Sequence, residues 1–359
     1  MKLLQLNFEK GWRGGERQTL LCMQAFRQRG HEVSLLARRG GELARRAREQ
    51  GFPVHEFAGP FQACRFLAGQ GRHFEILHAQ TAGTLTWLAL LKLLLGKRSV
   101  VFTRRTAFPV TAAKTARTRW KWQRADALVA ISQAAAAEPE RLGLHALIIP
   151  SAVLPRPLNQ AHLDEFAREH VPHGKRVIAT VAALSSEKDP LTMVQTVHAL
   201  RQKRDDFVFL HIGAGGDDEQ AARERVAALG LDDVYRFTGF HSGIDDLYRV
   251  MDVFVSSSRH EALGTSVLDA FQYGVPVVAT HTGGLAHSLA DGRGLSCPVG
   301  DAQALADAID RVLSDAALRA GMVERARAWV QREHDIDVMA ERYLDLYAAL
   351  LSGSGGRPG

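Results

Sequence analysis

A carboxylate, a glycine-led helix start and a second carboxylate follow one another in the second half of the chain. Glu261 stands shortly before Gly264, Thr265 and Ser266, where a helix is expected to begin, and Asp269 lies further along that helix. A helix start presents unpaired N–H groups and the positive end of the helix dipole, which suits a diphosphate. Carboxylates accept hydrogen bonds from sugar or ribose hydroxyls. The segment therefore predicts a site for a nucleotide-linked sugar.

The elements that must position these side chains alternate between strand and helix along the whole chain. Short β-rich runs such as 2–7, 98–103 and 253–256 are separated by helical stretches such as 84–95 and 190–203. Alternation at this spacing predicts the α/β class, with parallel, doubly wound sheets. The segment 301–332 is predicted to form one long helix.

The chain divides into two predicted domains, 1–155 and 156–335. A chain of 359 residues is too long for one typical core. The prolines at 150, 155 and 157 open a stretch without clear periodicity, which predicts a linker over 150–172. The Gly- and Ser-rich end, 352–359, is predicted to be a disordered tail.

Bulk composition narrows the class of protein. The three cysteines are widely spaced, without a metal-binding or disulfide pattern, which favours a reducing compartment such as the cytoplasm. The start of the chain predicts a strand and not a signal peptide. The apolar run 85–95 is too short to span a bilayer and predicts a buried helix. Residues 1–150 hold 24 Lys and Arg against 10 Asp and Glu, whereas 151–359 hold 21 against 29, so the first half is expected to face something anionic.

The motifs resemble, in their order, those of the retaining glycosyltransferases of family 4, which have the GT-B fold. Gly14-Gly15-Glu16-Arg17 follows the first strand, and Lys188 lies in Val181-Ala-Ala-Leu-Ser-Ser-Glu-Lys-Asp-Pro190. Gly213-Ala-Gly215 ends a strand, Phe237-Thr-Gly239-Phe240 precedes Asp246–Ser256, and the segment Glu261–Ala279 completes the set. The resemblance covers nearly the whole chain.

This resemblance implies two Rossmann-like domains facing a cleft, with an acceptor-side domain first and the nucleotide-sugar donor held mainly by the second. It implies metal-independent transfer with retention, and no cofactor besides the nucleoside diphosphate sugar. It also implies that a last helix, 336–351, packs back onto the first domain. The Asp-Asp pairs of the second half fall in predicted loops and helix starts, and we interpret them as structural and not as metal ligands.

The resemblance also assigns roles to single residues. Glu261 is expected to contact the donor sugar and Asp269 the ribose hydroxyls, although the family usually has Glu at the second place. Lys188 is expected to stabilise the leaving diphosphate, because a fixed cation opposes its developing charge. Arg105 stands where the family commonly has a histidine near the reacting carbon, and there it would clamp phosphate or an anionic acceptor. For His78, at the end of another strand, a catalytic and a structural role are both open.

Glycines mark further candidate contacts. Gly14 and Gly15 let the backbone approach a phosphate or an acceptor, and the alternative is a plain turn between strand and helix. Gly213 is counted with the donor-binding glycines, together with Gly264 and the two residues after it. For Glu16, contact with a substrate and a solvated position in the first helical turn are both open.

The segment Arg104–Arg124 carries seven basic residues, no acid, and Phe108, Trp120 and Trp122. This composition predicts contact with an anionic membrane surface, with aromatic rings at the interface. A solvated basic face is the alternative. Nucleic acid is not expected, because no nucleic-acid-binding signature accompanies the charge.

The predicted protein is therefore a bacterial-type cell-envelope glycosyltransferase, peripheral on the cytoplasmic face of the membrane, with a lipid-linked or lipopolysaccharide-core acceptor. Two alternatives stay open: a nucleotide-sugar epimerase of the same fold, and a non-catalytic sugar-nucleotide-binding protein of envelope assembly. The second is motivated by His281 and His287, which replace the acids that the family often has around Gly283-Gly284, and by the shortened acid Asp269.

Overall fold

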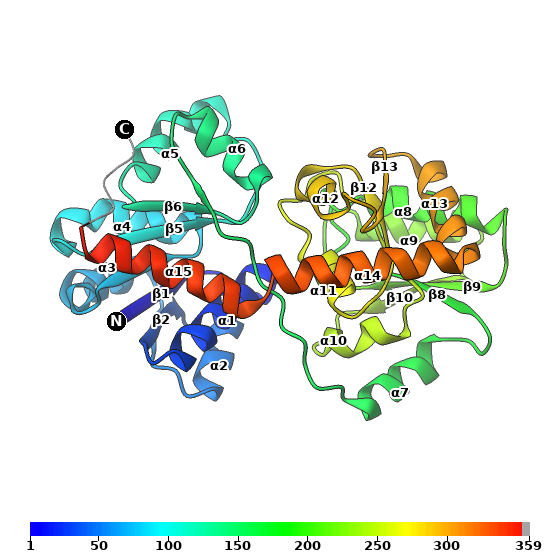
Figure 1. Cartoon of the computed structure of the whole chain (residues 1–359), viewed down its shortest axis with the longest axis horizontal. Helices are drawn as coiled ribbons and strands as arrows, with labels where there is room; N and C mark the ends of the chain where they lie inside the picture. Colours follow the sequence, from blue (N-terminus) through cyan, green and yellow to red (C-terminus); the bar gives the residue numbers. More distant parts are fainter. Residues whose placement is uncertain (354–359) are drawn as a thin grey trace. The chain divides into compact units, whose positions relative to one another are not determined.

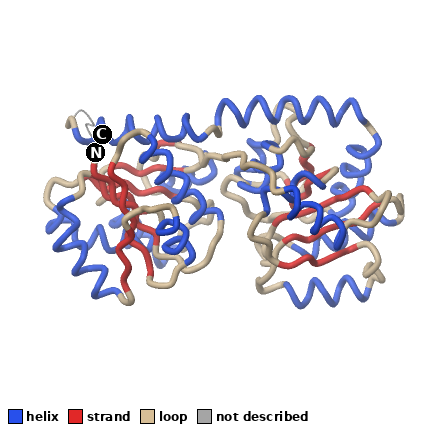
Figure 2. Tube along the Cα trace, turned by 90° about the horizontal axis from the view of Figure 1, so that it is seen from below, coloured by secondary structure: helices blue, strands red, loops and turns tan. Residues whose placement is uncertain are grey.

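The computed structural model describes residues 1–353 and forms two compact units. One unit contains Met1–Ala152 together with the residues from His334 onward, and the other contains Val153–Glu333. In each unit a single layer of strands is covered by helices on both faces (Figures 1 and 2). Residues 354–359, which make up most of the predicted tail, lie outside the described residues.

The first unit is built on a seven-stranded sheet in the order β3-β2-β1-β4-β5-β6-β7. All neighbouring strands run parallel. Because both faces are covered, apolar side chains predominate in the central strands; Leu3, Leu4 and Leu6 of the first strand are all fully buried. The strands are β1 (Lys2–Asn7), β2 (Glu32–Arg38), β3 (Val54–Phe57), β4 (Ile76–Ala79), β5 (Ser99–Arg104), β6 (Ala127–Ala130) and β7 (Leu147–Ile148).

Seven α-helices and two short 3-10 turns are described in this unit. The last helix, α15, lies beside α1, where Tyr343 and Tyr347 pack edge-on against Phe26. The elements are α1 (Gly14–Gln28), α2 (Glu42–Glu49), α3 (Pro60–Gln70), η1 (Gly71–His73), α4 (Ala82–Leu95), η2 (Ala112–Lys114), α5 (Thr115–Trp122), α6 (Gln133–Arg141) and α15 (Ile336–Leu351).

The second unit has a six-stranded parallel sheet in the order β10-β9-β8-β11-β12-β13. Its strands are β8 (Arg176–Val181), β9 (Phe207–Ile212), β10 (Tyr235–Gly239), β11 (Val253–Ser256), β12 (Val277–Thr280) and β13 (Leu295–Cys297). Its helices are α7 (Gln160–His170), α8 (Pro190–Arg201), α9 (Glu219–Ala228), α10 (Ile244–Leu247), η3 (Tyr248–Val250), α11 (Thr265–Gln272), α12 (Gly283–Ser288), α13 (Ala302–Ser314) and α14 (Ala316–Glu333). The two parallel sheets confirm the predicted α/β class.

Two sequence predictions about elements are wrong. The segment 301–332 forms two helices, α13 and α14, because Asp315 leaves the helical conformation and its carboxylate accepts a hydrogen bond from the Leu318 N–H, at 2.8 Å. The predicted linker 150–172 contains α7, which Asn159 caps through the His162 N–H and which buries Phe166. A helix with one buried apolar residue has too weak a periodicity to be recognised.

Among residues 1–353, no helix combines the length and the hydropathy that a bilayer crossing requires.

Candidate active site

Lys188 and Glu261 form an ion pair in the second unit, with the Lys188 ammonium on Glu261 Oε2. Lys188 follows β8 and Glu261 follows β11, and these are adjacent parallel strands. The carboxyl ends of adjacent parallel strands meet at one edge of the sheet, and the order of the strands reverses between β8 and β11. Both side chains keep some exposure, so the pair is accessible to a ligand. The structure thus brings together the two residues predicted to hold the phosphates and the sugar.

Hydrogen bonds and an ion pair hold the loop that carries Lys188 against the loop after β11. The Ser257 hydroxyl lies 2.9 Å from the carbonyl oxygens of both Lys188 and Asp189. The Arg259 N–H donates to the Glu187 carbonyl at 2.9 Å, and its guanidinium donates to the Asp189 carboxylate at 2.8 Å. These contacts hold the backbone of Lys188 next to Glu261.

Asp189 is the buried centre of this arrangement. It has a φ of 50°, a left-handed conformation that is rare outside glycine. Its carboxylate caps α8 by accepting from the Thr192 N–H at 3.2 Å and the Thr192 hydroxyl at 2.7 Å. The Asp189-Pro190 pair signals a helix start in the sequence, but the partnership with Arg259 has no local signal, because 70 residues separate the two.

Two glycines after β12 lie against the backbone of the loop that carries Glu261. The Gly284 N–H donates to the Glu261 carbonyl at 2.9 Å. A Cβ on Gly283 would lie 2.0 Å from the backbone carbonyl oxygen of Glu261, and one on Gly284 would lie 2.2 Å from the backbone carbonyl oxygen of Ala262. Only glycine permits this approach, so the pair shapes the Glu261 loop.

Gly213 has a similar supporting position. Its φ is 144°, and a Cβ there would lie 2.0 Å from the Ala182 carbonyl oxygen. Its N–H donates to the Gly239 carbonyl at 2.8 Å. The close approach of the loop that leads to Lys188 is therefore a reason for glycine at this position.

The start of α11 is available to an anion. Gly264, with a φ of 79°, precedes the helix, and no side chain of the described residues caps it. The N–H groups of Thr265 and Ser266 belong to the first turn, where no intrahelical acceptor exists. A Cβ at Gly264 would lie 3.5 Å from Glu261 Cγ, so this helix start adjoins the ion pair. Asp269, one turn further along, is only 4% exposed, which limits any ribose contact to the edge of its carboxylate.

In the first unit, the structure brings Arg105 and Gly15 together. Arg105 donates to the Gln80 side-chain oxygen at 2.6 Å and to the Ser151 hydroxyl at 3.1 Å. A Cβ on Gly15 would lie 3.7 Å from Arg105 Cδ, an ordinary contact. Gly14 and Gly15 form the first turn of α1. Arg105 thus donates to the neutral acceptors Gln80 and Ser151 close to this helix start.

His78 lies in the interior and has no exposed surface. Its two ring nitrogens are hydrogen bonded to the Thr103 and Tyr347 hydroxyls, each at 2.7 Å. Burial, with the positive charge of Arg105 as a second cause, lowers the pKa of His78 to about 3. The structure therefore favours the structural alternative for this residue.

Glu16 takes neither of its two expected positions. It is buried, and it accepts hydrogen bonds from the Arg13 N–H at 2.9 Å and from the Asn7 amide at 3.3 Å. Burial raises its pKa. Glu16 caps the start of α1 from inside the protein.

The two histidines that replace expected acids contact other side chains of the second unit. His281 is exposed, with its Nδ1 3.0 Å from the Ser296 hydroxyl. His287 lies against the Trp329 ring of α14, with 5.8 Å between ring centroids. The contacts described for these two side chains are thus with Ser296 and Trp329.

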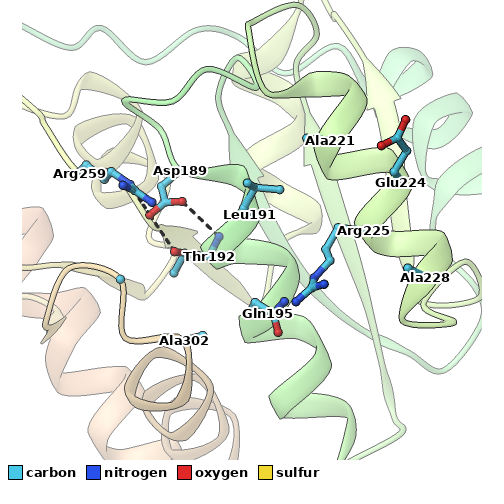
Figure 3. Close-up of a pocket in the computed structure, with 11 residues that line it drawn as sticks. Asp189, Leu191, Thr192, Gln195, Ala221, Glu224, Arg225, Ala228, Arg259 and Ala302 are labelled. Carbon is cyan, nitrogen blue, oxygen red and sulfur yellow. Dashed lines mark hydrogen bonds and ion pairs between the residues drawn. The ribbon is translucent and has the colours of Figure 1, made fainter.

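A cavity of about 490 Å³ opens beside the two loops that carry Lys188 and Arg259 (Figure 3). Asp189 and Arg259 face each other on one side of it, and Arg225 points toward Gln195 on another. Its walls come from α8, α9, the loop after β11 and the start of α13, and Lys188 and Glu261 are not among the lining residues. The cavity therefore adjoins the candidate active site without containing its charged pair.

Family models match both units. Residues 12–159 match the model described as Glycosyltransferase Family 4, and residues 163–329 match the one described as Glycosyl transferases group 1. Together the two matches cover most of the chain.

Curated relatives are similar in sequence. The chain is 28% identical over 296 residues to the lipopolysaccharide core biosynthesis mannosyltransferase LpsB of Rhizobium meliloti (strain 1021), a match that covers 79% of this chain and 81% of LpsB. It is 28% identical over 184 residues to the lipopolysaccharide core biosynthesis glycosyltransferase LpsE of the same strain. That match covers 51% of this chain and 53% of LpsE, about half of each.

Among solved structures, Anabaena Alr3699/HepE in complex with UDP and glucose superimposes with a TM-score of 0.87, over 97% of this chain and all of that one. Sequence identity is 18%, so this likeness concerns the fold.

Proposed function

Because this chain belongs to the family-4-like glycosyltransferases of GT-B fold, we propose that it transfers a hexosyl group from a nucleoside diphosphate sugar to a lipid-linked or lipopolysaccharide-core acceptor. The observation that carries the proposal is the accessible Lys188–Glu261 pair beside the uncapped start of α11. An ammonium, a carboxylate and free N–H groups within one site match the charges and hydroxyls of a sugar diphosphate.

The donor diphosphate competes with Glu261 for Lys188 in this proposal. When the phosphates take the ammonium, the Glu261 carboxylate is released to accept hydrogen bonds from the sugar hydroxyls. Before the donor binds, each side chain of the ion pair holds the other in place. Asp269 adds an acceptor for the ribose at the edge of its carboxylate.

The reaction follows from the same groups. The bond between the anomeric carbon and the diphosphate oxygen breaks, and the acceptor oxygen bonds to that carbon from the same face, which retains configuration. The acceptor proton passes to the departing phosphate oxygen. Lys188 and the Thr265 and Ser266 N–H groups stabilise the charge that develops on the leaving diphosphate, without a metal ion. Arg105, near the start of α1, is placed to bind an anionic group of the acceptor.

The acceptor class is supported by the names of LpsB and LpsE, both described as enzymes of lipopolysaccharide core biosynthesis. An amphiphilic acceptor lies in a membrane, so we place the protein on the cytoplasmic face of the bacterial cell membrane. The exposed basic residues of Arg104–Arg124, namely Lys114, Arg117, Arg119 and Arg124, provide contact with anionic lipids. Arg104 and Trp122 are buried and serve the fold instead.

A panel of UDP-, GDP- and ADP-sugars, screened by thermal shift and then by transfer to lipopolysaccharide-core acceptors, tests this function. We expect one donor to raise the melting temperature and to be consumed only when an acceptor is present. Lys188→Met should reduce turnover by about a hundred-fold or more, because it removes charge stabilisation of the leaving group. Glu261→Ala should remove most of the turnover.

The matched control is Glu324→Ala, an exposed acid on α14 that should leave turnover unchanged. Unchanged transfer in the Glu261→Ala protein would contradict the proposed site. Epimerised sugar formed without an acceptor would replace the proposal with the epimerase, and donor binding without any turnover would replace it with a binding protein.

A further inference from the structure

Helix α4 is apolar around its whole circumference, but the described part of the protein covers only one side of it. Leu85, Leu88 and Leu95 are buried against the first unit. Leu90, Leu93 and Leu94 are 58%, 96% and 61% exposed. A helix that is apolar all round normally lies inside a protein or in contact with lipid, so its exposed side indicates that something apolar covers it.

Basic side chains lie on α5 beside this helix and just after its C-terminal end, and the one charged residue of the helix is already paired. Lys92 forms an ion pair with Asp126. Lys97, exposed, and Arg98, partly exposed, follow the C-terminal end of α4. On the neighbouring helix α5, Lys121 donates to the Thr86 hydroxyl of α4 at 3.2 Å, which places the basic residues of α5 beside α4 (Figure 1).

The charge of the region is almost entirely of one sign. Residues 60–124, which contain α3, α4 and α5, hold 12 Lys and Arg and a single acid, Glu75. A second copy of the chain placed on the same face would bring two basic surfaces together. An anionic surface with an apolar interior is complementary to both the charge and the leucines.

We propose that α4 is the membrane-inserting element of this protein: Leu90, Leu93 and Leu94 enter the boundary between headgroups and acyl chains of an anionic bilayer. Lys97, Arg98 and the exposed basic residues of α5 then lie at the level of the lipid phosphates. The apolar part of the contact thus comes from α4, outside the segment Arg104–Arg124, which contributes charge. This assignment rests on the proposed function for its membrane-borne acceptor, but its test requires no transfer reaction.

Flotation of the full chain with vesicles tests the assignment. Vesicles of phosphatidylcholine with roughly one quarter phosphatidylglycerol provide a moderately anionic surface, and pure phosphatidylcholine vesicles are the neutral comparison. We expect binding to the anionic vesicles that weakens as salt is added. Leu93→Gln with Leu94→Gln should lower the partition coefficient about ten-fold or more, because two exposed apolar side chains no longer enter the bilayer. Lys97→Glu with Arg98→Glu should lower it about five-fold per residue.

The matched control is Phe240→Gln, which removes an apolar side chain of the second unit with similar exposure, 64%. It should bind as the unchanged protein does, and equal loss in this control would identify non-specific adhesion and overturn the assignment. The leucine variants should keep their melting temperature, since the replaced side chains are exposed and glutamine is a good helix former.

Three results would overturn the proposal: no binding of the unchanged protein to anionic vesicles, full binding of the leucine variants, or a dimer in sedimentation that the leucine variants convert to a monomer without any change in vesicle binding. Donor-induced thermal shift, measured on the same samples, reports on the sugar-nucleotide site separately. A failure of membrane binding is thereby distinguished from a failure of the proposed activity.

Discussion

At the scale of single residues, the position of Lys188 is determined by neighbours that are themselves under constraint. Asp189 adopts a left-handed conformation, which costs about 1 kcal/mol for a residue with a Cβ. The contacts of Asp189 with Arg259 and Thr192, and those of Ser257 with the backbone, offset that cost. The side chain that is proposed to meet the phosphates therefore leaves a rigid loop, and its ammonium does not have to be ordered anew for each turnover.

Ser257→Ala tests this rigidity. The change leaves the carbonyls of Lys188 and Asp189 without their hydroxyl donor, and it should lower the free energy of unfolding by about 1–2 kcal/mol. Because Lys188 is then less well positioned, kcat should fall by about ten-fold while the donor KM changes less. Steady-state kinetics and urea unfolding measure the two effects. Ser314→Ala, at the exposed end of α13, is the control, and an unchanged kcat in Ser257→Ala would exclude a positioning role.

The glycines of the second unit make a separate prediction. Gly213→Ala should lower the free energy of unfolding by about 3 kcal/mol or more, because its Cβ would meet the Ala182 oxygen and its φ is unfavourable for alanine. Gly215→Ala, where φ is 76° and the space is open, should cost only about 1 kcal/mol. Equal unfolding midpoints for the two variants in urea would show that the loop relaxes around a side chain.

At the scale of elements, the docking of α15 depends on a buried series of side chains that are hydrogen bonded to one another. Tyr347 and Tyr343 of α15 reach β4 and β5, where Tyr347 is bonded to His78 and Tyr343 to the Thr103 hydroxyl at 2.9 Å. The Thr103 hydroxyl is also hydrogen bonded to the other ring nitrogen of His78. The helix is thus attached to the sheet by matched donors and acceptors as well as by its apolar face, and this fixes its register.

The neutral state of His78 makes stability depend on pH. Its pKa in the folded protein is about 3, below the ordinary value of 6.5, so below pH 6.5 the unfolded chain binds a proton that the folded protein does not. Stability is complete above about pH 6.5 and falls as the pH drops toward 3, by at most about 1.4 kcal/mol per pH unit from this residue. His211, whose pKa burial lowers to about 4, adds a similar loss over a narrower range.

His78→Gln should therefore be less stable than the unchanged protein near neutral pH but should lose stability less steeply on acidification. Urea unfolding at several pH values between about 4 and 7 gives the slope. An identical slope for the two proteins would mean that His78 is protonated in the folded state, contrary to its burial.

At the scale of the whole molecule, the proposed donor binding and membrane binding belong to different units. The second unit carries the Lys188–Glu261 pair and the start of α11, whereas the first carries the excess of basic residues, Arg105 and the exposed face of α4. Donor binding and membrane binding are thus assigned to different parts of the chain, and each can be measured while the other is impaired.

Hydrogen exchange with the nucleoside diphosphate of the donor that the panel identifies tests this division. We expect slower exchange in 186–190 and 259–269, with β2 and β3 of the first unit unchanged. At a nucleotide concentration a hundred times the Kd, the free energy of unfolding should rise by about 2.7 kcal/mol. Adenosine monophosphate, which lacks a diphosphate, is the control ligand. Protection confined to the first unit would contradict the assignment of the donor site.

The sequence by itself determined the α/β class, the alternation of strands and helices, the family and the candidate residues around Glu261, because these depend on local periodicity and on short motifs of glycine and carboxylate. It did not separate α13 from α14 or detect α7, because there the deciding contacts are a single cap and a single buried phenylalanine.

Only the tertiary structure decided which candidates meet. Three contacts join residues that are 70 to 269 positions apart. They are the ion pair of Lys188 with Glu261, the ion pair of Asp189 with Arg259, and the contact of buried His78 with α15. A histidine at the end of a strand has the same local pattern whether a later helix covers it or not, and an apolar helix has the same pattern whether one side or both are covered. Burial is a property of the neighbours, and the neighbours are brought together only by the complete fold.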